Sequence, residues 1–401
     1  MVEAMVKKPI IKALEGDMAV TEAIRQINPD VMAAYPVTPQ TEIVMEFAEL
    51  VAEGLVDTEY IRVESEHAAM SSCIGASTAG ARAMTATCGP GLALMWEVLW
   101  VASGLRCPII MAVVNRSLSA PLNILTDQTD MMGSRDAGWV QIFAENHQEV
   151  YDNYIQAVRI AEHPDIMLPI MCAHAGFVLG HTLGRVEVLP DEVVKDFVGE
   201  YKARYSLLDI DHPKTFGAYD HWDYFFEHRR PQFEAMNNAL RVIPEIGQEY
   251  GKISGRHYGL VESYRLEDAE VAILIIGSGA GACREAVDEM REKGVKAGML
   301  KVRCFRPFPA DEIVKALKHI KAVAAMDRCE CFGAEGGPLF IETCSAFFNR
   351  GLPVKMIDFF YGLGGRDTVP SEFSDIFREL SKIAETGEIK PPIIRFLSVR
   401  E

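Results

Sequence analysis

Glu66 is the first candidate for chemistry in this sequence. It stands at the head of a run of small residues in the stretch VESEHAAMSSCIGASTAGAR, residues 63 to 82. Apolar neighbours desolvate a carboxylate and favour its protonated form, an environment suited to a group that shares a proton. A solvated surface glutamate does not need such packing, so Glu66 is predicted to belong to a functional site. For the adjacent His67, packing beside a cleft is favoured over catalysis.

Thr38 and Arg116 are the candidate ligands of a substrate. The two prolines of YPVTP, residues 35 to 39, stiffen the exit from a predicted strand and leave Thr38 displaying its hydroxyl. Arg116 follows the apolar run PIIMAVV, and a guanidinium holds a carboxylate by two hydrogen bonds. Each has an alternative role: Thr38 could be the N-cap of the next helix, and Arg116 could pair with Asp127 or Asp130.

A glycine-rich turn and a competing glycine motif complete the candidates. Gly89, Pro90 and Gly91 make a rigid turn after a predicted strand, at the edge of the sheet that Thr38 also faces. In the second half, VAILIIGSGAGA at 271–282 satisfies the dinucleotide fingerprint. That fingerprint also needs an acidic residue at the end of the next strand, where this sequence has arginine and cysteine. A tight strand-to-helix turn is therefore the favoured interpretation.

Metal chemistry has little support in the sequence. Cys329 and Cys331 form a lone C-x-C, and they are predicted to be free thiols. His221 and His228 lack a matching set of ligands and are predicted to lie at a surface or interface. No C-x-x-C-x-x-C occurs, so no iron–sulfur cluster and no metal site is expected in this chain.

Alternating apolar runs and helical patterns predict two α/β domains that position these residues. In the first, the predicted strands are 31–35, 60–63, 83–88, 108–114 and 167–173, and the helices are 39–53, 66–80, 91–103 and 147–161. In the second, the strands are 271–276, 296–302, 320–326 and 353–359, and the helices are 281–293, 310–318, 336–348 and 371–384. The predicted boundaries are 1–200 for a doubly wound domain, 201–262 for a connecting arm that ends in an amphipathic helix, and 263–401 for a smaller α/β domain.

Composition narrows the functional class. Of 401 residues, 49% are hydrophobic, which is ample for buried cores. Asp and Glu number 57 against 40 Lys and Arg, and the net charge of -17 disfavours nucleic acid and anionic membranes as partners. Nine cysteines, an odd count mostly within apolar segments, indicate reduced thiols. No apolar stretch is long enough for a signal peptide or a membrane span, so a cytoplasmic protein is expected.

Together these motifs resemble a known family. SEHAAMSSCIGASTAGAR followed by AMTATCGPG resembles the pyrimidine-binding domain of thiamine diphosphate enzymes. YPVTP, VESEHAA and NRSLSAPLNI narrow the resemblance to the alpha chains of multi-subunit 2-oxoacid:ferredoxin oxidoreductases. SRDAGWVQIFAENHQE, LKVRCFRPFPADEI and FFYGLGGRD extend it nearly end to end. The resemblance implies a thiamine diphosphate-binding, pyrimidine-type domain followed by a domain like the C-terminal domain of transketolase.

The resemblance also implies roles for the candidate residues. Glu66 corresponds to the glutamate that hydrogen-bonds N1′ of the cofactor's aminopyrimidine, and Thr38 and Arg116 to residues that meet the carboxylate and keto oxygen of the substrate. The expected cofactor-binding residues are Glu66, Tyr35, Pro36, Gly89, Pro90 and Gly91. Thr38, in place of a charged residue, suits a small neutral keto acid such as pyruvate, while branched-chain or aryl 2-oxoacids remain alternatives.

Partner chains are part of the same expectation. Thiamine enzymes hold the diphosphate through Mg²⁺ at a G-D-G motif, and the one Gly-Asp here is followed by Met18. A beta subunit is therefore expected to share the thiamine diphosphate and carry Mg²⁺, with [4Fe-4S] clusters in partner subunits, gamma and delta chains, ferredoxin as electron acceptor and coenzyme A as acyl acceptor. The competing hypotheses are the beta chain of a dehydrogenase-complex E1 component and a non-catalytic scaffold. YPVTP with Arg116 argues against the first, and the presence of Glu66 together with Thr38 and Arg116 argues against the second.

Overall fold

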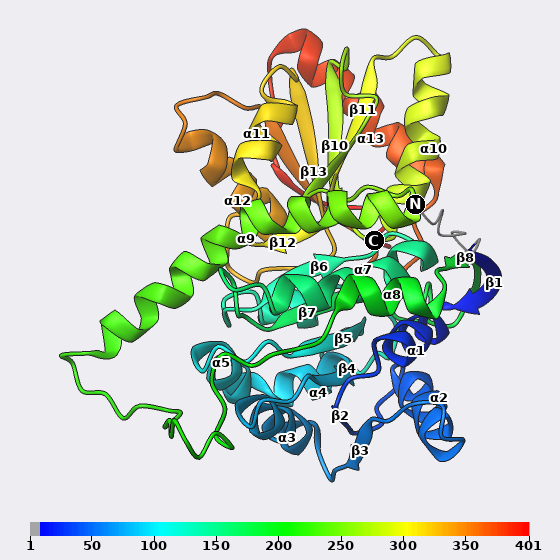
Figure 1. Cartoon of the computed structure of the whole chain (residues 1–401). Helices are drawn as coiled ribbons and strands as arrows, with labels where there is room; N and C mark the ends of the chain where they lie inside the picture. The colour runs from blue at the N-terminus through cyan, green and yellow to red at the C-terminus, as the bar shows by residue number, and fades with distance from the viewer. Residues whose placement is uncertain (1–8, 401) are drawn as a thin grey trace, which may run out of the picture.

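The computed structural model describes residues 9–400, which form two α/β domains stacked one above the other (Figure 1). Each domain is a sheet with helices on both faces, and we call the two domains the lower layer and the upper layer. The lower layer is a seven-stranded sheet in the order β12-β6-β7-β5-β4-β2-β3, and its strands are parallel except for β12. The strands are β2 (Val31–Ala34), β3 (Glu59–Arg62), β4 (Ala83–Thr87), β5 (Ile110–Asn115), β6 (Val140–Phe143), β7 (Ile170–Ala175) and β12 (Cys304–Arg306).

Helices cover both faces of this sheet because its strands are apolar on both sides. β4, β5, β6 and β7 are buried at every position, as expected for parallel strands between two helical layers. One face packs against α1 (Gly16–Ile27), α2 (Thr41–Ala52) and α7 (His147–Ala161). The other packs against α3 (Glu66–Thr78), α4 (Gly89–Leu94), α5 (Trp96–Gly104) and α6 (Thr129–Gly133). The predicted helix 91–103 is thus two helices that meet at Met95.

The upper layer is a six-stranded sheet in the order β15-β14-β13-β10-β11-β9, antiparallel only at β9. Its strands are β9 (Val261–Tyr264), β10 (Val271–Ile276), β11 (Ala297–Val302), β13 (Ala322–Asp327), β14 (Met356–Phe360) and β15 (Ile394–Phe396). One face carries α10 (Gly279–Glu292) and α13 (Pro370–Thr386), and the other carries α11 (Ala310–Leu317) and α12 (Pro338–Phe348). A short 3-10 turn, η1 (Leu363–Gly365), follows β14. The two predicted α/β domains are confirmed.

Several elements escaped the sequence patterns. β1 (Ile10–Glu15) pairs with β8 (Leu183–Val188) in a separate two-stranded sheet, and α8 (Asp191–Val198) follows β8. β6, β9, β12 and β15 are strands of three or four residues, too short for a period-two pattern to be recognised. β12 lies between β11 and β13 in the chain, both of which belong to the upper sheet, but it pairs with β6 of the lower sheet. Its hydrogen bonds therefore join the two layers.

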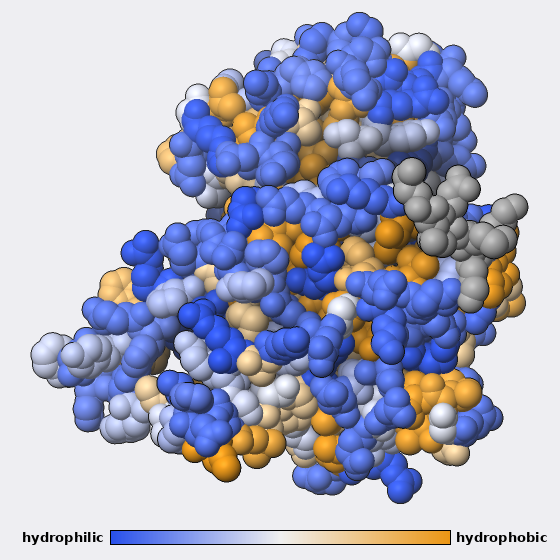
Figure 2. Space-filling view, in the orientation of Figure 1, coloured by the Kyte–Doolittle hydropathy of each residue, from blue (hydrophilic) through white to orange (hydrophobic). Residues whose placement is uncertain are grey.

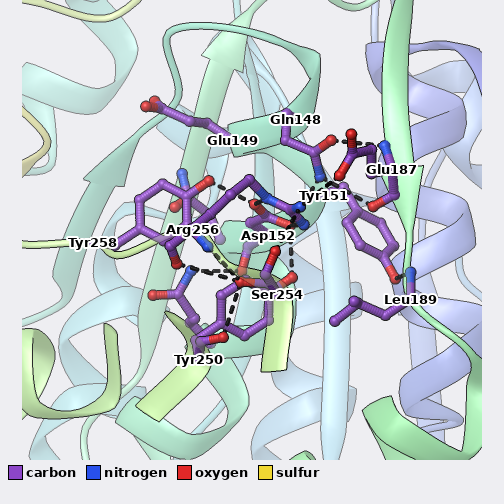
Figure 3. A network of polar contacts seen from close by, with 12 residues as sticks. Gln148, Glu149, Tyr151, Asp152, Glu187, Leu189, Tyr250, Ser254, Arg256 and Tyr258 are labelled. Carbon is purple, nitrogen blue, oxygen red and sulfur yellow. Dashed lines mark hydrogen bonds and ion pairs between the residues drawn. The ribbon is translucent and has the colours of Figure 1, made fainter. Parts of the chain in front are cut away.

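The connecting arm ends in a 30-residue helix, α9 (Phe225–Ser254), whose first half extends beyond the body of the molecule (Figure 1). Its second half is fixed to α7 through Asp152, a fully buried carboxylate (Figure 3). Asp152 accepts hydrogen bonds from the hydroxyls of Tyr250 at 2.6 Å and Tyr258 at 2.5 Å, and it pairs with the guanidinium of Arg256 at 2.6 Å. Arg256 also reaches Glu187 of β8. A buried charge with this many partners is stable only when all of them are in place, so the network holds the end of the arm.

The surface in the view of Figure 2 is mostly hydrophilic, with apolar residues gathered in patches between the helices of the lower layer. This agrees with the net charge of -17. Within residues 9–400, no helix combines the length and the apolar character needed to cross a bilayer. The nine cysteines are free.

Candidate functional site

The candidate residues meet where the strand order of the lower sheet reverses. From β2 the chain runs outward to β3 and then returns to β4 on the other side of β2, so the carboxyl ends of β2 and β4 flank the reversal point. β2 and β4 pair only at Val31–Ala83 and Met32–Met84 and then separate. Ligands of open α/β sheets bind at such reversal points, outside the carboxyl ends of the strands.

Glu66 opens α3 in the loop that follows β3. The helix is capped by Ser65, whose hydroxyl accepts the backbone N–H of Ala68 at 3.2 Å. Glu66 is 7% exposed, so its side chain is buried as the run of small residues predicts. His67, its neighbour, is exposed, and its ring forms no hydrogen bond or ion pair with any of residues 9–400.

Gly91 allows the Glu66 carboxylate to lie against α4. A Cβ atom at Gly91 would fall 2.6 Å from Oε1 of Glu66 and 2.4 Å from Oγ1 of Thr87, closer than any real Cβ contact. The hydroxyl of Thr87 is buried and has no hydrogen-bond partner among the described residues. Buried hydroxyls are normally satisfied, so this one indicates a polar ligand beside Glu66. The carboxylate of Glu66, the unpartnered hydroxyl of Thr87 and the backbone of Gly91 therefore lie against one another, and we call this group the cradle.

Arg116 follows β5 and packs against the other glycine of the turn. A Cβ atom at Gly89 would lie 3.1 Å from Cβ of Arg116 and 2.9 Å from its carbonyl oxygen. The Arg116 guanidinium donates to the carbonyls of Thr38 at 2.9 Å and Asn123 at 3.2 Å. Among residues 9–400, its side chain forms no ion pair with Asp127 or Asp130, so the ion-pair alternative is wrong.

Asp130 is the residue that holds this edge together. Its carboxylate accepts the backbone N–H groups of Gly89 at 3.1 Å and Arg116 at 3.0 Å, and the side-chain amide of Asn115 at 2.8 Å. Burial raises the pKa of Asp130 to about 7, while the N–H of Arg116 lowers it. The sequence named Asp130 only as an ion partner, because nothing in the local pattern TDQTD indicates that the carboxylate joins two loops.

The YPVTP turn lies on the exposed rim of the site. Tyr35, Pro36 and Thr38 are exposed, and the Thr38 hydroxyl forms no hydrogen bond with any of residues 9–400. α2 begins at Thr41 with Gln40 as its N-cap, so the alternative that Thr38 caps this helix is wrong. Gln40 instead spans the gap between the separating strands, donating to the carbonyl of Ala86 at 3.1 Å.

Cys88 connects this rim to β4. Its thiol contacts the Thr38 carbonyl at 3.0 Å, and burial raises the pKa of Cys88 to about 12. The thiol is therefore protonated at neutral pH and serves as a donor, not as a nucleophile. Nothing in the sequence indicates a role for Cys88, since a cysteine beside a glycine turn has no distinguishing pattern.

The residues considered as metal ligands lie away from this site. His228 contacts Asp220 at 2.5 Å at the surface, and His221 is exposed. Within the described chain, three carboxylates come close enough to bind a cation, those of Glu145, Glu149 and Glu262. They surround the ammonium of Lys301 at 2.5 to 2.6 Å, so an internal cation already neutralises them.

Comparison with protein families follows the same division into two layers. A family described as pyruvate flavodoxin/ferredoxin oxidoreductase, thiamine diphosphate-binding, matches residues 22–248, and pyruvate:ferredoxin oxidoreductase core domain II matches residues 269–373. The chain belongs to the pyruvate:ferredoxin oxidoreductase family. The sequence-based assignment to the 2-oxoacid:ferredoxin oxidoreductases and to a thiamine diphosphate-binding fold is confirmed.

Named relatives cover almost the whole chain. The pyruvate synthase subunit PorA of Thermotoga maritima is 49% identical over 97% of this chain and 98% of its own, and PorA of Methanocaldococcus jannaschii is 42% identical over 94% and 97%. The ketoisovalerate oxidoreductase subunit VorA of Pyrococcus abyssi is 41% identical over 95% and 96%.

Solved structures show the same fold at lower identity. The 2-oxoglutarate:ferredoxin oxidoreductase of Magnetococcus marinus has a TM-score of 0.73 at 21% identity, and this chain covers 65% of that longer chain. A split-gene transketolase has a TM-score of 0.56 at 12% identity, over 93% of this chain and all of that one. The transketolase-like architecture predicted from the sequence is confirmed.

Proposed function

We propose that the chain is the alpha subunit of a pyruvate:ferredoxin oxidoreductase, which converts pyruvate and coenzyme A to acetyl-CoA and carbon dioxide and passes the electrons to ferredoxin. The names of the PorA relatives support pyruvate as substrate and confirm the function predicted from the sequence. The observation that carries the proposal within this chain is the cradle of Glu66, Thr87 and Gly91 beside Arg116 at the reversal point of the sheet.

The cradle fits one end of thiamine diphosphate. When bound, this cofactor supplies a carbon nucleophile that adds to the keto group and accepts the electrons of decarboxylation. Glu66 would hold a proton at N1′ of the aminopyrimidine, and the unpartnered hydroxyl of Thr87 lies beside the same position. Burial of Glu66 excludes water from that proton, and Gly91 keeps the approach to the carboxylate open.

Arg116 and Thr38 are the proposed substrate ligands. The guanidinium of Arg116 and the exposed hydroxyl of Thr38 are proposed to bind a carboxylate and a keto oxygen, and the bond from Arg116 to the Thr38 carbonyl holds the guanidinium beside Thr38. A neutral side chain at position 38 suits a small 2-oxoacid that carries no charge besides its carboxylate. The VorA relatives make 2-oxoisovalerate the second candidate substrate.

Partner chains complete the proposed enzyme. The sequence has no G-D-G motif, so a beta subunit would hold the diphosphate and Mg²⁺. We assign the [4Fe-4S] clusters to partner subunits, which with beta would be gamma and delta chains of a cytoplasmic enzyme. Coenzyme A is bound in the solved 2-oxoglutarate:ferredoxin oxidoreductase, which supports it as the acyl acceptor.

The test of the catalytic assignment is Glu66→Gln in the enzyme assembled with its natural partner chains. We expect pyruvate-dependent reduction of viologen to fall at least a thousandfold while gel filtration shows the same assembly. Glu64→Gln, two residues away and exposed, is the matched control and should keep full turnover. Wild-type turnover by the Glu66 variant would contradict the proposal.

The substrate is tested separately, by comparing turnover of pyruvate, 2-oxoglutarate, 2-oxoisovalerate and phenylglyoxylate. We expect the highest kcat/KM for pyruvate, and Arg116→Gln should raise KM for each substrate because it removes the charge that meets the carboxylate. A preference for 2-oxoisovalerate would select the second candidate, and dependence on lipoyl domains in place of ferredoxin would exclude the family's reaction.

A further inference from the structure

A groove of about 680 Å³ lies beside the protruding half of α9. One wall is the helix itself, and the other is formed by Trp100 of α5, the loop before β6, and β12. These segments lie at the amino-terminal end of β6, whereas Glu66 and Arg116 lie beyond the carboxyl ends of their strands. The groove is therefore separate from the site described above.

The charge of the groove is opposite to that of the protein. Four of its lining residues are arginines and one is an aspartate, in a chain with a net charge of -17. Two of these arginines have acidic partners: Arg306 pairs with Glu342 at 2.5 Å, and Arg230 pairs with Glu234 at 3.5 Å. Arg135 and Arg229 have no acidic partner among residues 9–400: Arg135 donates to the Met132 carbonyl and Arg229 to the side chain of Gln232.

Apolar side chains follow the helix between the arginines. Phe226 is 77% exposed and Phe233 is 66% exposed, and with Met236 they stand at i, i+7 and i+10 of α9. Large apolar side chains so exposed and so regularly spaced are uncommon on a surface without a partner. Arg229 lies over the ring of Trp100 at 5.6 Å, which fixes its guanidinium in the groove.

The two walls are held at a fixed separation. Gly138 has a φ of 80°, and a Cβ atom there would fall 2.2 Å from Nε2 of Gln232. The helix therefore approaches the loop closely at this one position, and Gln232 is buried there. The groove is built into the fold and does not depend on mobile side chains alone.

We propose that this groove binds an acidic amphipathic helix of a partner chain. Apolar anchors at helical spacing, flanked by arginines without acidic partners, match a helix that presents leucine-like residues on one face and carboxylates beside them. A second copy of this chain is disfavoured, because a two-fold contact across the groove would place the same arginines opposite one another. The inference rests on the proposed assembly with partner subunits, and it names the surface that one of them occupies.

The first experiment is a cross-link in the assembled enzyme. Phe233 is replaced by the photoreactive residue p-benzoylphenylalanine, the complex is illuminated, and the products are identified by mass spectrometry. We expect a cross-link to one partner-chain segment that is helical and rich in Asp and Glu. A cross-link to another copy of this chain, a cross-link to a segment without acidic residues, or the absence of any cross-link overturns the proposal.

The second experiment reverses the charges. The double variant Arg135→Glu, Arg229→Glu should weaken association with the cross-linked partner at least tenfold, measured by titration of the full chain with that partner at 150 mM salt. Arg229→Lys with Arg135→Lys should retain most of the affinity, which separates charge from folding. Lys252→Glu lies on the same helix outside the groove and is the matched control. Unchanged affinity of the double glutamate variant, with unchanged circular dichroism, overturns the proposal. Because binding is read without turnover, the result does not depend on the Glu66 test.

Discussion

The two large sheets of this protein each have a point where the strand order reverses, and the candidate residues gather at the one in the lower sheet. In the lower sheet β2 and β4 separate, and the edge displays Glu66, Arg116 and the Thr38 hydroxyl. In the upper sheet the corresponding edge between β10 and β13 is filled by Gln128 of the lower layer. Its N–H donates to the Arg328 carbonyl at 2.8 Å and its side chain reaches the Ile276 carbonyl.

This difference agrees with our interpretation that the glycine motif at 271–282, in the upper sheet, is a tight turn and not a dinucleotide site. A Cβ atom at Gly279 would fall 2.6 Å from the hydroxyl of Tyr361, and one at Gly277 would fall 3.2 Å from Nε2 of Gln128. The glycines there admit neighbouring side chains, whereas Gly89 and Gly91 admit the two residues proposed to act. A reversal point is thus a place where a ligand can bind, and the neighbouring layer decides whether it does.

The largest expected contrast is between the thiols at the two edges. Cys88 follows β4, and burial raises its pKa to about 12; a hydrogen bond from Cys329 lowers the pKa of Cys331, after β13, to about 7. The thiolate reacts, so Cys331 should be alkylated by iodoacetamide with a rate that rises with pH to a midpoint of about 7. Cys88 should react at least a thousandfold more slowly, as measured by mass spectrometry of the native chain.

Cys329→Ala tests the cause of that contrast. It removes the thiol that donates to Cys331, so the midpoint for Cys331 should move upward toward its ordinary value. Equal labelling of Cys88 and Cys331 in the native chain would mean that the two edges do not differ in thiol chemistry.

Alanine at one glycine of each edge separates activity from stability. Gly91→Ala puts a methyl group against Glu66 and Thr87, so we expect viologen reduction to fall at least a hundredfold with the fold retained. Gly279→Ala puts a methyl group against Tyr361 and should lower the free energy of unfolding by about 1–3 kcal/mol, the usual cost of overpacking, without changing turnover per folded enzyme. If both variants lose activity equally, the upper edge also takes part in the reaction.

The pH dependence of stability is expected to depend on Asp130. No buried carboxylate plays the same part in the upper sheet among the described residues that hydrogen-bond to Gln128. The pKa of Asp130 is raised from 3.8 to about 7, so between these values the folded protein binds a proton that the unfolded chain does not. Its contribution to stability is therefore complete below about pH 4, falls by roughly 1.4 kcal/mol per pH unit up to about 7, and is constant above. Asp130→Asn should remove this slope in urea unfolding from pH 5 to 8, while Asp223→Asn at the surface should leave it. An unchanged slope would contradict the assignment.

The smallest effect is expected where the two edges touch. Asn123 donates to the Gly364 carbonyl at 2.9 Å and its backbone carbonyl accepts from Arg116, so it joins the upper layer to the loop that follows β5. Asn123→Ala should cost about 1 kcal/mol in stability, the usual value of one hydrogen bond, and raise KM for pyruvate a few-fold with kcat nearly unchanged. A change in kcat alone would show that the contact does not position Arg116.

The sequence by itself determined the fold class, the long buried strands and the residues at the ends of β2, β3, β4 and β5. Runs such as PIIMAVV are short, apolar and rich in β-branched residues, which predicts buried strands. A carboxylate among small residues, or an arginine directly after such a strand, can likewise be recognised from the local sequence. The motifs YPVTP, VESEHAA and NRSLSAPLNI also identified the family.

Only the tertiary structure decided which of these residues meet and which partners they have. The bond of Arg116 to the Thr38 carbonyl spans 78 residues, the bond of Asn123 to the Gly364 carbonyl spans 241, and β12 pairs with a strand of the other layer. Asp130, Thr87 and the arginines of the α9 groove carry no sequence pattern. Their roles depend on burial and on neighbours distant in the chain, and these arise only when the two layers pack.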